Sequence, residues 1–146
     1  AILMASASED VYVTTIERDE TRYMECLKNV KKCKLDKIIN VVFQDALEVN
    51  MGDAKYDMIF IDAAKGQYTK FFEKFKYFLN EGGVIITDNL NFHGYVDMDL
   101  KDISSRNIRG LVRKIRAYVE FLENNDMYNT KFYDFGDGIS VSERRL

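Results

Sequence analysis

Apolar and polar residues recur with two periods along this chain, and together they predict an α/β fold. Four short runs rich in β-branched and aromatic residues predict strands over 11–16, 38–43, 56–61 and 84–87. Apolar residues at helical spacing predict helices over 19–34, 68–79 and 105–124, the second of them ended by Gly82 and Gly83. Two further β-rich runs flank glycines at 136–138 and predict a C-terminal hairpin. Strands that alternate with helices indicate a mostly parallel sheet, here with an antiparallel hairpin at one edge.

Composition places the chain among ordinary globular proteins. Its 146 residues are 47% hydrophobic and 31% charged, which predicts a single domain over 1–146. No apolar run approaches the roughly 18 residues of a membrane span, so no membrane association is expected. The opening AILMASAS carries no basic residue and does not resemble a signal peptide. A net charge of −3 argues against a wholly basic nucleic-acid-binding protein but allows a local basic patch.

The two cysteines predict free thiols. Cys26 and Cys33 lie seven residues apart in one predicted helix, which separates their Cα atoms by roughly 10 Å, too far for a disulfide. Without a histidine or a third cysteine nearby, a metal site at this pair is not expected. Free thiols are typical of a reducing compartment, so a cytoplasmic location is predicted.

Each of the four predicted parallel strands is followed by an acid. These acids are Glu17, Asp45, Asp62 and Asp88. In an open α/β sheet, ligands bind outside the carboxyl ends of the strands, where side chains from neighbouring strands converge. Any single acid in this position could instead cap the following helix. Four in succession favour a shared site.

Oxygen donors dominate the last two strand ends. Asp62, Asp88 and Asn89 offer two carboxylates and an amide carbonyl, a set that suits Mg²⁺ or Ca²⁺, or Mn²⁺, rather than zinc. A divalent cation there would favour the neutral amine of Lys65 and make it a candidate general base. The alternative for Lys65 is a solvated lysine at a helix start. His93, the single histidine, is assigned to the loop rather than to the chemistry.

The first two strand ends suggest a nucleoside. An acid after the first strand of a Rossmann-like sheet commonly binds ribose hydroxyls, which makes Glu17 a candidate. Asp45, at the next strand end, is placed to reach an adenine. Each signal is weak by itself.

The order of four motifs resembles a known family. TTIERDE, FQDALEV, YDMIFIDAAKGQY and GGVIITDNLNFHG are similar to the cation-dependent O-methyltransferases that use S-adenosylmethionine, among them the catechol and caffeoyl-CoA enzymes. The resemblance covers essentially the whole chain, and IDAAK with TDN is its most specific part. It implies a Rossmann-like class I methyltransferase fold, a mostly parallel sheet with helices on both faces and a C-terminal antiparallel hairpin, but lacking the first strand. It further implies that Asp62, Asp88 and Asn89 hold the metal and that Lys65 deprotonates the acceptor hydroxyl.

The same resemblance implies the cofactor contacts. Glu17 would bind the ribose of S-adenosylmethionine, Asp45 with Ala46 would border the adenine, and Asp62 would also lie beside the cofactor. A homodimer is expected on the same ground.

One part of the family pattern is missing from this sequence. The family's Gly-rich loop, which follows its first strand and cradles the methionine end of the cofactor, is absent, and AILMASAS looks like the helix after that loop. The missing strand would lie centrally, between the strands that contain Val13 and Phe60. We therefore expect a gap in the core and impaired cofactor binding for a chain that begins at Ala1, which would be a fragment or have lost its N-terminal part.

The acceptor is suggested by a basic stripe on the last predicted helix. Arginines recur there at spacings of three, four and three residues, namely Arg106, Arg109, Arg113 and Arg116. They share one helix face and could follow a phosphate backbone, or form a solvated basic face. SRNIRGLVRKI and FGDGISVSER also resemble bacterial tRNA 5-hydroxyuridine methyltransferases, which make 5-methoxyuridine. That resemblance implies a tRNA acceptor; a small catechol-like phenol is the alternative.

Two other classes compete with an active enzyme. A phosphoacceptor receiver domain also has strands that end like IFIDAAKG and VIITDN, but it would need a lysine followed by proline after its last strand, and the chain has no proline. A catalytically inactive RNA-binding fragment fits the missing glycine loop better.

Overall fold

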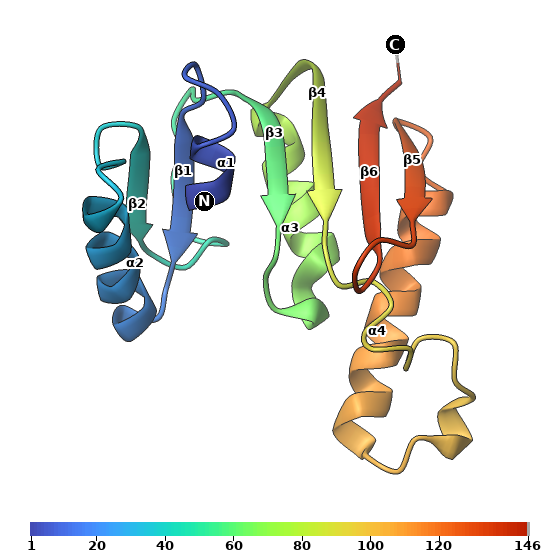
Figure 1. Ribbon diagram of the computed structural model, residues 1–146. Helices are drawn as coiled ribbons and strands as arrows, with labels where there is room; N and C mark the ends of the chain where they lie inside the picture. The colour runs from blue at the N-terminus through green and yellow to red at the C-terminus, as the bar shows by residue number, and fades with distance from the viewer. Residues whose placement is uncertain (146) are drawn as a thin grey trace. The chain divides into compact units, whose positions relative to one another are not determined.

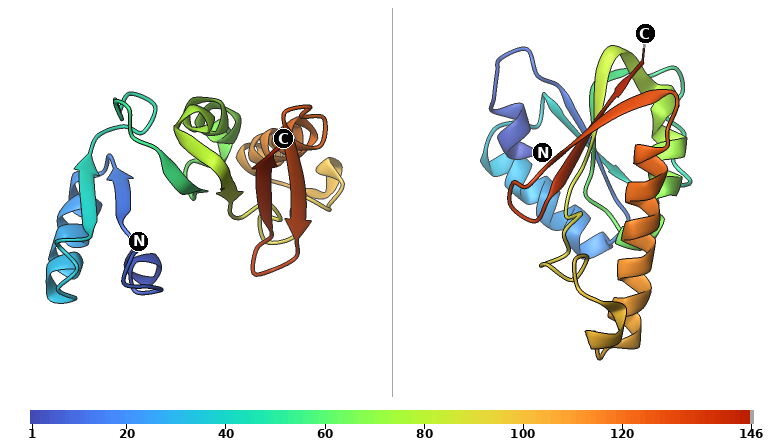
Figure 2. Two further views of the ribbon diagram at one scale, coloured as in Figure 1. Left: turned by 90° about the horizontal axis from the view of Figure 1, so that it is seen from above. Right: turned by 90° about the vertical axis from the view of Figure 1, so that its right-hand side faces the viewer.

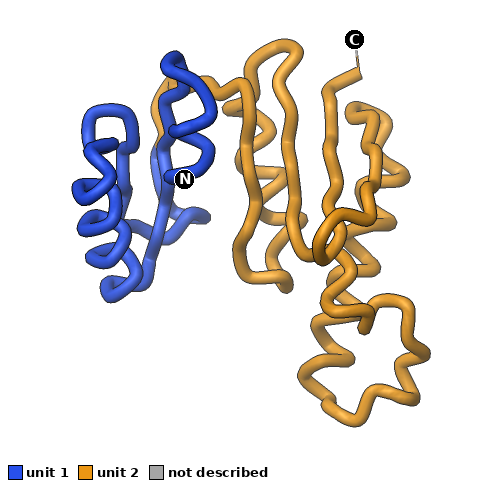
Figure 3. Tube along the Cα trace, viewed as in Figure 1, with its two compact units in different colours: residues 1–50 blue, residues 51–146 orange. Residues whose placement is uncertain are grey.

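The computed structural model describes residues 1–145, which form two compact units (Figure 3). The N-terminal unit comprises Ala1–Asn50 and the C-terminal unit begins at Met51. Each unit has its own β-sheet and its own helices. The prediction of one domain over the whole chain stays a prediction.

A pair of parallel strands with two helices makes up the N-terminal unit (Figure 1). Its elements are α1 (Ile2–Ala5), β1 (Val13–Glu17), α2 (Glu20–Lys32) and β2 (Ile39–Phe43). Asp19 caps α2 by accepting a hydrogen bond from the backbone N–H of Arg22. Ala5, Val30 and Ile39 form the buried core, so both helices pack on the face of the sheet that carries Ile39. The two cysteines are free, as predicted.

A four-stranded mixed sheet organises the C-terminal unit, with strand order β3-β4-β6-β5. Its strands are β3 (Tyr56–Ile61), β4 (Leu79–Thr87), β5 (Tyr128–Tyr133) and β6 (Ile139–Arg144). Its helical elements are η1 (Lys65–Gln67), α3 (Tyr68–Phe75), η2 (Lys76–Phe78), η3 (Leu100–Asp102) and α4 (Arg106–Glu123). β3 and β4 are parallel, whereas β6 is antiparallel to both β4 and β5. The helices α3 and α4 lie on one face of this sheet (Figure 2).

These features confirm the predicted α/β class, with parallel strand pairs and a C-terminal antiparallel hairpin. The expected placement of helices on both faces involves both units together and stays a prediction. No helix within residues 1–145 is long and apolar enough to cross a membrane.

Aromatic side chains fill the core between the helices and the sheet of the C-terminal unit. Phe72 of α3 has 0% exposure. Its ring centroid lies 6.4 Å from that of Tyr118, 5.4 Å from that of Phe121 and 5.1 Å from that of Tyr128. The buried Tyr118 hydroxyl also shares a hydrogen bond of 2.7 Å with Thr87 of β4. Burial raises the pKa of Tyr118, which therefore stays a neutral hydrogen-bonding group.

The predicted boundary between the second helix and the fourth strand is wrong. The helix ends at Phe75 and continues only as the short turn η2, while β4 begins at Leu79 instead of residue 84. A register shift in the β3–β4 ladder accommodates the extra residues, and Gly82 has a φ of +73° within it. Glycines read as a helix stop therefore belong to a bulged strand.

Gly83 is required by the close approach of β3. A Cβ at this position would lie 2.9 Å from the carbonyl oxygen of Asp57 and 3.1 Å from that of Asn80. We expect Gly83→Ala to lower the free energy of unfolding by about 1–3 kcal/mol, because backbone atoms would have to move. Urea unfolding followed by near-ultraviolet circular dichroism of the tyrosines measures this change.

Gly110 provides the matched control. It lies inside α4, and a Cβ there would meet nothing within 4 Å. Gly110→Ala should raise the free energy of unfolding by about 0.5–1 kcal/mol, since alanine is the better helix former. Equal effects of the two substitutions would contradict the role given to Gly83.

One edge of the four-stranded sheet is formed by the largely apolar strand β3. Along the described chain, β1 pairs only with β2, and β3 pairs only with β4. Met58 and Phe60 of β3 are 42% and 41% exposed. A strand with so many apolar residues is typical of a position inside a sheet, so its exposed edge is unusual.

Candidate active site

The carboxyl ends of β3 and β4 bring two of the predicted acids together. Ile61 and Thr87 are paired in the parallel ladder, so Asp62 and Asp88 follow at equivalent positions. The backbone N–H of Asp88 also donates to the carbonyl of Ile61 at 3.1 Å. Neither acid caps a helix: η1 and α3, which follow Asp62, have no side-chain cap, and η3, which follows Asp88, is capped by Asp99. The capping alternative therefore does not explain these two residues.

Tyr68, at the start of α3, is bound to the end of β4. Its side chain is 1% exposed, and its hydroxyl donates to the carbonyl oxygen of Asp88 at 2.9 Å. Burial raises the pKa of Tyr68, and the negative charges of Asp62 and Asp88 raise it further. From the sequence, Tyr68 was predicted only as the first residue of the helix over 68–79 and not as part of the site.

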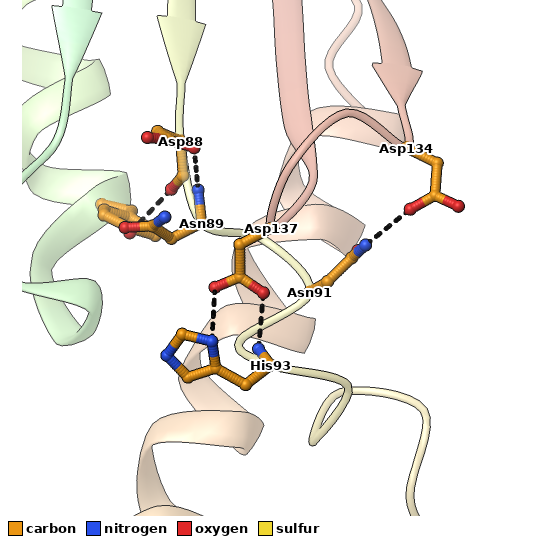
Figure 4. A network of polar contacts seen from close by, with 7 residues as sticks. Asp88, Asn89, Asn91, His93, Asp134 and Asp137 are labelled. Carbon is orange, nitrogen blue, oxygen red and sulfur yellow. Dashed lines mark hydrogen bonds and ion pairs between the residues drawn. The ribbon is translucent and has the colours of Figure 1, made fainter.

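Asn89 continues from β4 in an unusual backbone conformation. Its φ is +62°, in the left-handed region that asparagine tolerates better than most residues. Its backbone N–H donates to Oδ1 of Asp88 at 2.7 Å (Figure 4). The backbone therefore turns sharply where the second strand end meets the loop.

Lys65 lies in η1, three residues after Asp62. Its Nζ is 5.4 Å from the centroid of the Phe92 ring, within the range of a cation–π contact. At the neighbouring Gly66, a Cβ would lie 3.1 Å from Nζ of Lys114 on α4. Lys65 is partly buried and lies over an aromatic ring, and it forms no ion pair with an acid within residues 1–145.

The donors present fit a hard divalent cation. Within residues 1–145, no group of three or more His, Cys, Asp or Glu side chains could hold a metal. A metal here would therefore rely on two carboxylates and the amide oxygen of Asn89, as the resemblance implies. Such an oxygen set suits magnesium, calcium or manganese and leaves positions for water or substrate.

Three of the four predicted cofactor residues, Glu17, Asp45 and Ala46, lie at the strand ends of the N-terminal unit, and the fourth, Asp62, follows β3. The backbone N–H of Gln44 donates to the carbonyl of Glu17 at 3.1 Å, so the ends of β1 and β2 are adjacent. Oε1 of Glu17 accepts the N–H of Asp19 at 2.8 Å. Asp45 forms an ion pair of 3.0 Å with Arg18.

The turn after β2 is also fixed by Asp45. Oδ1 of Asp45 accepts the N–H of Leu47 at 2.8 Å, with Ala46 between them. Asp45 therefore stabilises the turn that follows its strand and caps no helix, because β2 leads to β3 without a helix between them. A role for Glu17, Asp45 and Ala46 in cofactor binding stays a prediction.

The arginine stripe of α4 divides into two pairs. Arg109 donates to the carbonyls of Ile103 and Ser104, and Arg116 donates to those of Val96 and Met98. These two arginines hold the loop between β4 and α4.

The other pair faces solvent. Arg106 and Arg113 are exposed, and their side chains have no hydrogen bond or ion pair with any of residues 1–145. Only this second pair is therefore free to contact an external phosphate. Spacing alone placed all four on one face, and the difference arises from the path of the preceding loop, whose carbonyls bind Arg109 and Arg116.

Asp137 in the hairpin turn was missed as a functional candidate. It accepts a hydrogen bond from the backbone N–H of His93, and its carboxylate lies beside the His93 imidazole (Figure 4). The turn sequence GDG was recognised only as a chain reversal. A possible signal was the acid between two glycines, but its partner lies 44 residues earlier.

Comparison with known proteins gives a consistent family. The model of the O-methyltransferase family matches residues 1–145. A candidate caffeoyl-CoA O-methyltransferase of Arabidopsis thaliana is 30% identical over 144 residues, covering 93% of this chain and 60% of the relative.

Solved structures agree with the family match. A candidate caffeoyl-CoA O-methyltransferase of Staphylococcus aureus is 40% identical, with a TM-score of 0.93 over 99% of this chain and 69% of that one. An O-methyltransferase of Bacillus cereus in complex with S-adenosylhomocysteine (SAH) is 25% identical, with a TM-score of 0.75 over 92% of this chain and 63% of that one. The chain thus spans about 60% of the length of the curated relatives it matches.

Proposed function

Because this chain belongs to the O-methyltransferase family, we propose that the protein transfers a methyl group from S-adenosylmethionine to a hydroxyl with the help of a divalent cation. The observation that carries the proposal is the meeting of Asp62 and Asp88 at paired strand ends, with Lys65 in the turn that follows. The Bacillus cereus relative holds SAH, the product of methyl donation, which supports the choice of methyl donor.

The residues divide the work between binding and proton transfer. Asp62, Asp88 and Asn89 would hold the cation, which when bound withdraws charge from the acceptor hydroxyl and so eases its deprotonation. Lys65 takes the proton at Nζ. The Phe92 ring restrains Lys65, so that less freedom is lost when the acceptor is bound.

The cofactor would be bound by the strand ends of the N-terminal unit. Glu17 accepts hydrogen bonds from the ribose hydroxyls, and Asp45 with Ala46 borders the adenine. Asp62 would contact the methyl donor as well as the cation. Positioning of donor and acceptor in line supplies most of the rate gain, on the order of 7–11 kcal/mol in favourable cases.

The acceptor we propose is 5-hydroxyuridine in tRNA. The exposed Arg106 and Arg113 support it, because unpaired arginines one turn or two apart on a helix can contact successive phosphates. Relatives named as caffeoyl-CoA O-methyltransferases support a small catechol-like phenol as the second candidate. A catalytically inactive RNA-binding fragment is the third. A cytoplasmic homodimer belongs to the same proposal.

Cofactor binding and methyl transfer test the function directly. Calorimetric titration of the natural polypeptide that contains these residues should show micromolar binding of S-adenosylmethionine. Tritium from the labelled methyl group should then appear in tRNA that carries 5-hydroxyuridine, in the presence of Mg²⁺ and not with EDTA. Methyl transfer to a catechol and not to tRNA would identify a small phenol, instead of 5-hydroxyuridine, as the acceptor. Cofactor binding without any transfer would favour the inactive fragment, and absence of cofactor binding would overturn the proposal.

The unpaired arginines give a sharper test of the tRNA acceptor. The double substitution Arg106→Ala with Arg113→Ala should weaken tRNA binding and reduce the salt dependence of log K by about 2, one per lost phosphate contact. Filter binding at several salt concentrations measures both quantities. Lys28→Ala with Lys32→Ala, two exposed lysines of α2, is the charge-matched control and should leave the slope unchanged. The same salt dependence of log K in both double variants would contradict a phosphate-binding role of α4.

A further inference from the structure

We propose that Asp137 is a positioning residue of this site, which acts by fixing the loop segment 89–93 that begins with Asn89. This inference rests on the proposed function, because the segment carries one expected metal donor and the aromatic ring beside the expected base. Asp137 itself touches neither Lys65 nor the two acids through any hydrogen bond in residues 1–145.

Backbone hydrogen bonds join the segment to the hairpin turn Gly136–Gly138, here called the GDG turn. The N–H of Leu90 donates to the carbonyl of Gly138 at 2.9 Å, and the N–H of Asn91 donates to that of Asp137 at 2.8 Å. Asn91 also donates from Nδ2 to Oδ1 of Asp134 at 2.9 Å. The backbone of the GDG turn therefore fixes the position of residues 90 and 91.

The carboxylate of Asp137 adds the last connection. Its Oδ1 accepts the backbone N–H of His93 at 2.5 Å, and its Oδ2 lies 3.6 Å from Nδ1 of the same histidine (Figure 4). Oδ2 is buried and accepts no hydrogen bond within residues 1–145. The carboxylate therefore contacts His93 through both its backbone N–H and its imidazole.

The segment needs this support because its backbone is strained. Asn89, Phe92 and His93 have φ angles of +62°, +46° and +56°. Residues with a Cβ disfavour this region, and a bulky phenylalanine disfavours it more than asparagine does. Such conformations persist only where surrounding contacts determine them, and they cluster at functional sites.

The side chain of Asn91 packs closely against Gly138 of the GDG turn. A Cβ on Gly138 would lie 2.5 Å from Oδ1 of Asn91, and Gly138 itself has a φ of +77°. Only glycine fits there, so the turn and the segment are matched to each other. The consequence is functional: the same segment orients the amide of Asn89 and the ring of Phe92 over which Lys65 lies.

Hydrogen exchange followed by mass spectrometry tests the positioning role without needing activity. In Asp137→Ala, amides of 89–98 should exchange about tenfold faster, while those of α4 stay as slow as in the unchanged chain. Asp137→Asn keeps an oxygen for the His93 N–H and should exchange nearly like the unchanged chain. Asp126→Ala, in an exposed turn, is the matched control. Unchanged exchange over 89–98 in Asp137→Ala would overturn the proposal.

Mn²⁺ binding, followed by electron paramagnetic resonance, links the segment to the site. Asp137→Ala should weaken binding by about tenfold or more, and Asp137→Asn should restore most of it, since loss of an orienting residue typically costs 10–100-fold in affinity. Loss of Mn²⁺ in Asp137→Asn with the segment still ordered would make Asp137 a direct ligand and overturn the positioning role. Absence of Mn²⁺ binding by the unchanged chain would count against the proposed function alone, because exchange still decides the role of Asp137.

A second variant covers the case in which Asp137→Ala fails to fold. Asn91→Ala removes the bond to Asp134 and the side-chain packing against Gly138 but keeps the backbone bonds to the hairpin, so it should accelerate exchange over the same segment by a smaller factor. Exchange at the rate of the unchanged chain would show that contacts with the β5–β6 hairpin do not order the segment, and would overturn the proposal.

Discussion

Replacing Phe72 with alanine is expected to lower the free energy of unfolding of the C-terminal unit by about 3–5 kcal/mol. Phe72 has no exposed surface, and its ring meets three other aromatic rings from α4 and β5. Truncation would remove this buried area and leave a cavity that rigid neighbours cannot fill. Edge-to-face contacts with those rings would also be lost. Urea titration monitored by near-ultraviolet circular dichroism measures the effect, since the chain contains no tryptophan.

Tyr77 is the control for this substitution. It is an aromatic residue only five positions further on, but its side chain is 69% exposed. Tyr77→Ala should change the free energy of unfolding by about 0.5 kcal/mol or less. A loss from Tyr77→Ala comparable to that from Phe72→Ala would show that the aromatic cluster around Phe72 does not hold α3 and α4 to the sheet.

Local signals predicted most of the fold. The helix over 105–124 was predicted within one residue at each end, because Ser105 caps it and apolar residues recur at helical spacing along it. For the strand over 56–61, the predicted first and last residues are those observed. In both cases the information lies within a few residues of the boundary.

The start of β4 depended on information from another strand. Gly82 and Gly83 read as a helix stop, although they form a bulge that lets β4 follow the backbone of β3 near Asp57. The identity of that neighbour is fixed only when the sheet forms. Sequence periodicity within 68–87 carries no trace of it.

The candidate site shows the same division. Asp62 and Asp88 could be paired from the sequence because parallel strands end at one edge of a sheet. Asp137 could not, because its partner His93 is brought near only by the pairing of β4 with β6. The arginine stripe was recognised, but its division into loop-bound and solvent-facing pairs required the path of residues 96–104.

Replacing Lys65 with methionine is expected to reduce the turnover number by about 10²–10⁴-fold, the usual contribution of a general base. Methionine keeps the length of the unbranched side chain and its contact with the Phe92 ring, so the position of the turn should be preserved. Because Lys65 acts on the acceptor proton and not on the methyl donor, affinity for S-adenosylmethionine should stay within about threefold. Single-turnover transfer of a labelled methyl group and calorimetric titration measure the two quantities.

Lys70→Met is the matched control, since Lys70 is exposed on α3 and has no recorded partner in the described chain. It should leave both the turnover number and cofactor affinity unchanged. A general base also predicts a pH signature: activity of Lys65→Met should recover as the pH rises and hydroxide replaces the missing amine, whereas activity of Lys70→Met should follow the unchanged protein. A drop in cofactor affinity that matches the drop in turnover would instead assign Lys65 to binding. In that case Asp62, Asp88 and Asn89 with their cation would have to acidify the acceptor hydroxyl without help from Lys65.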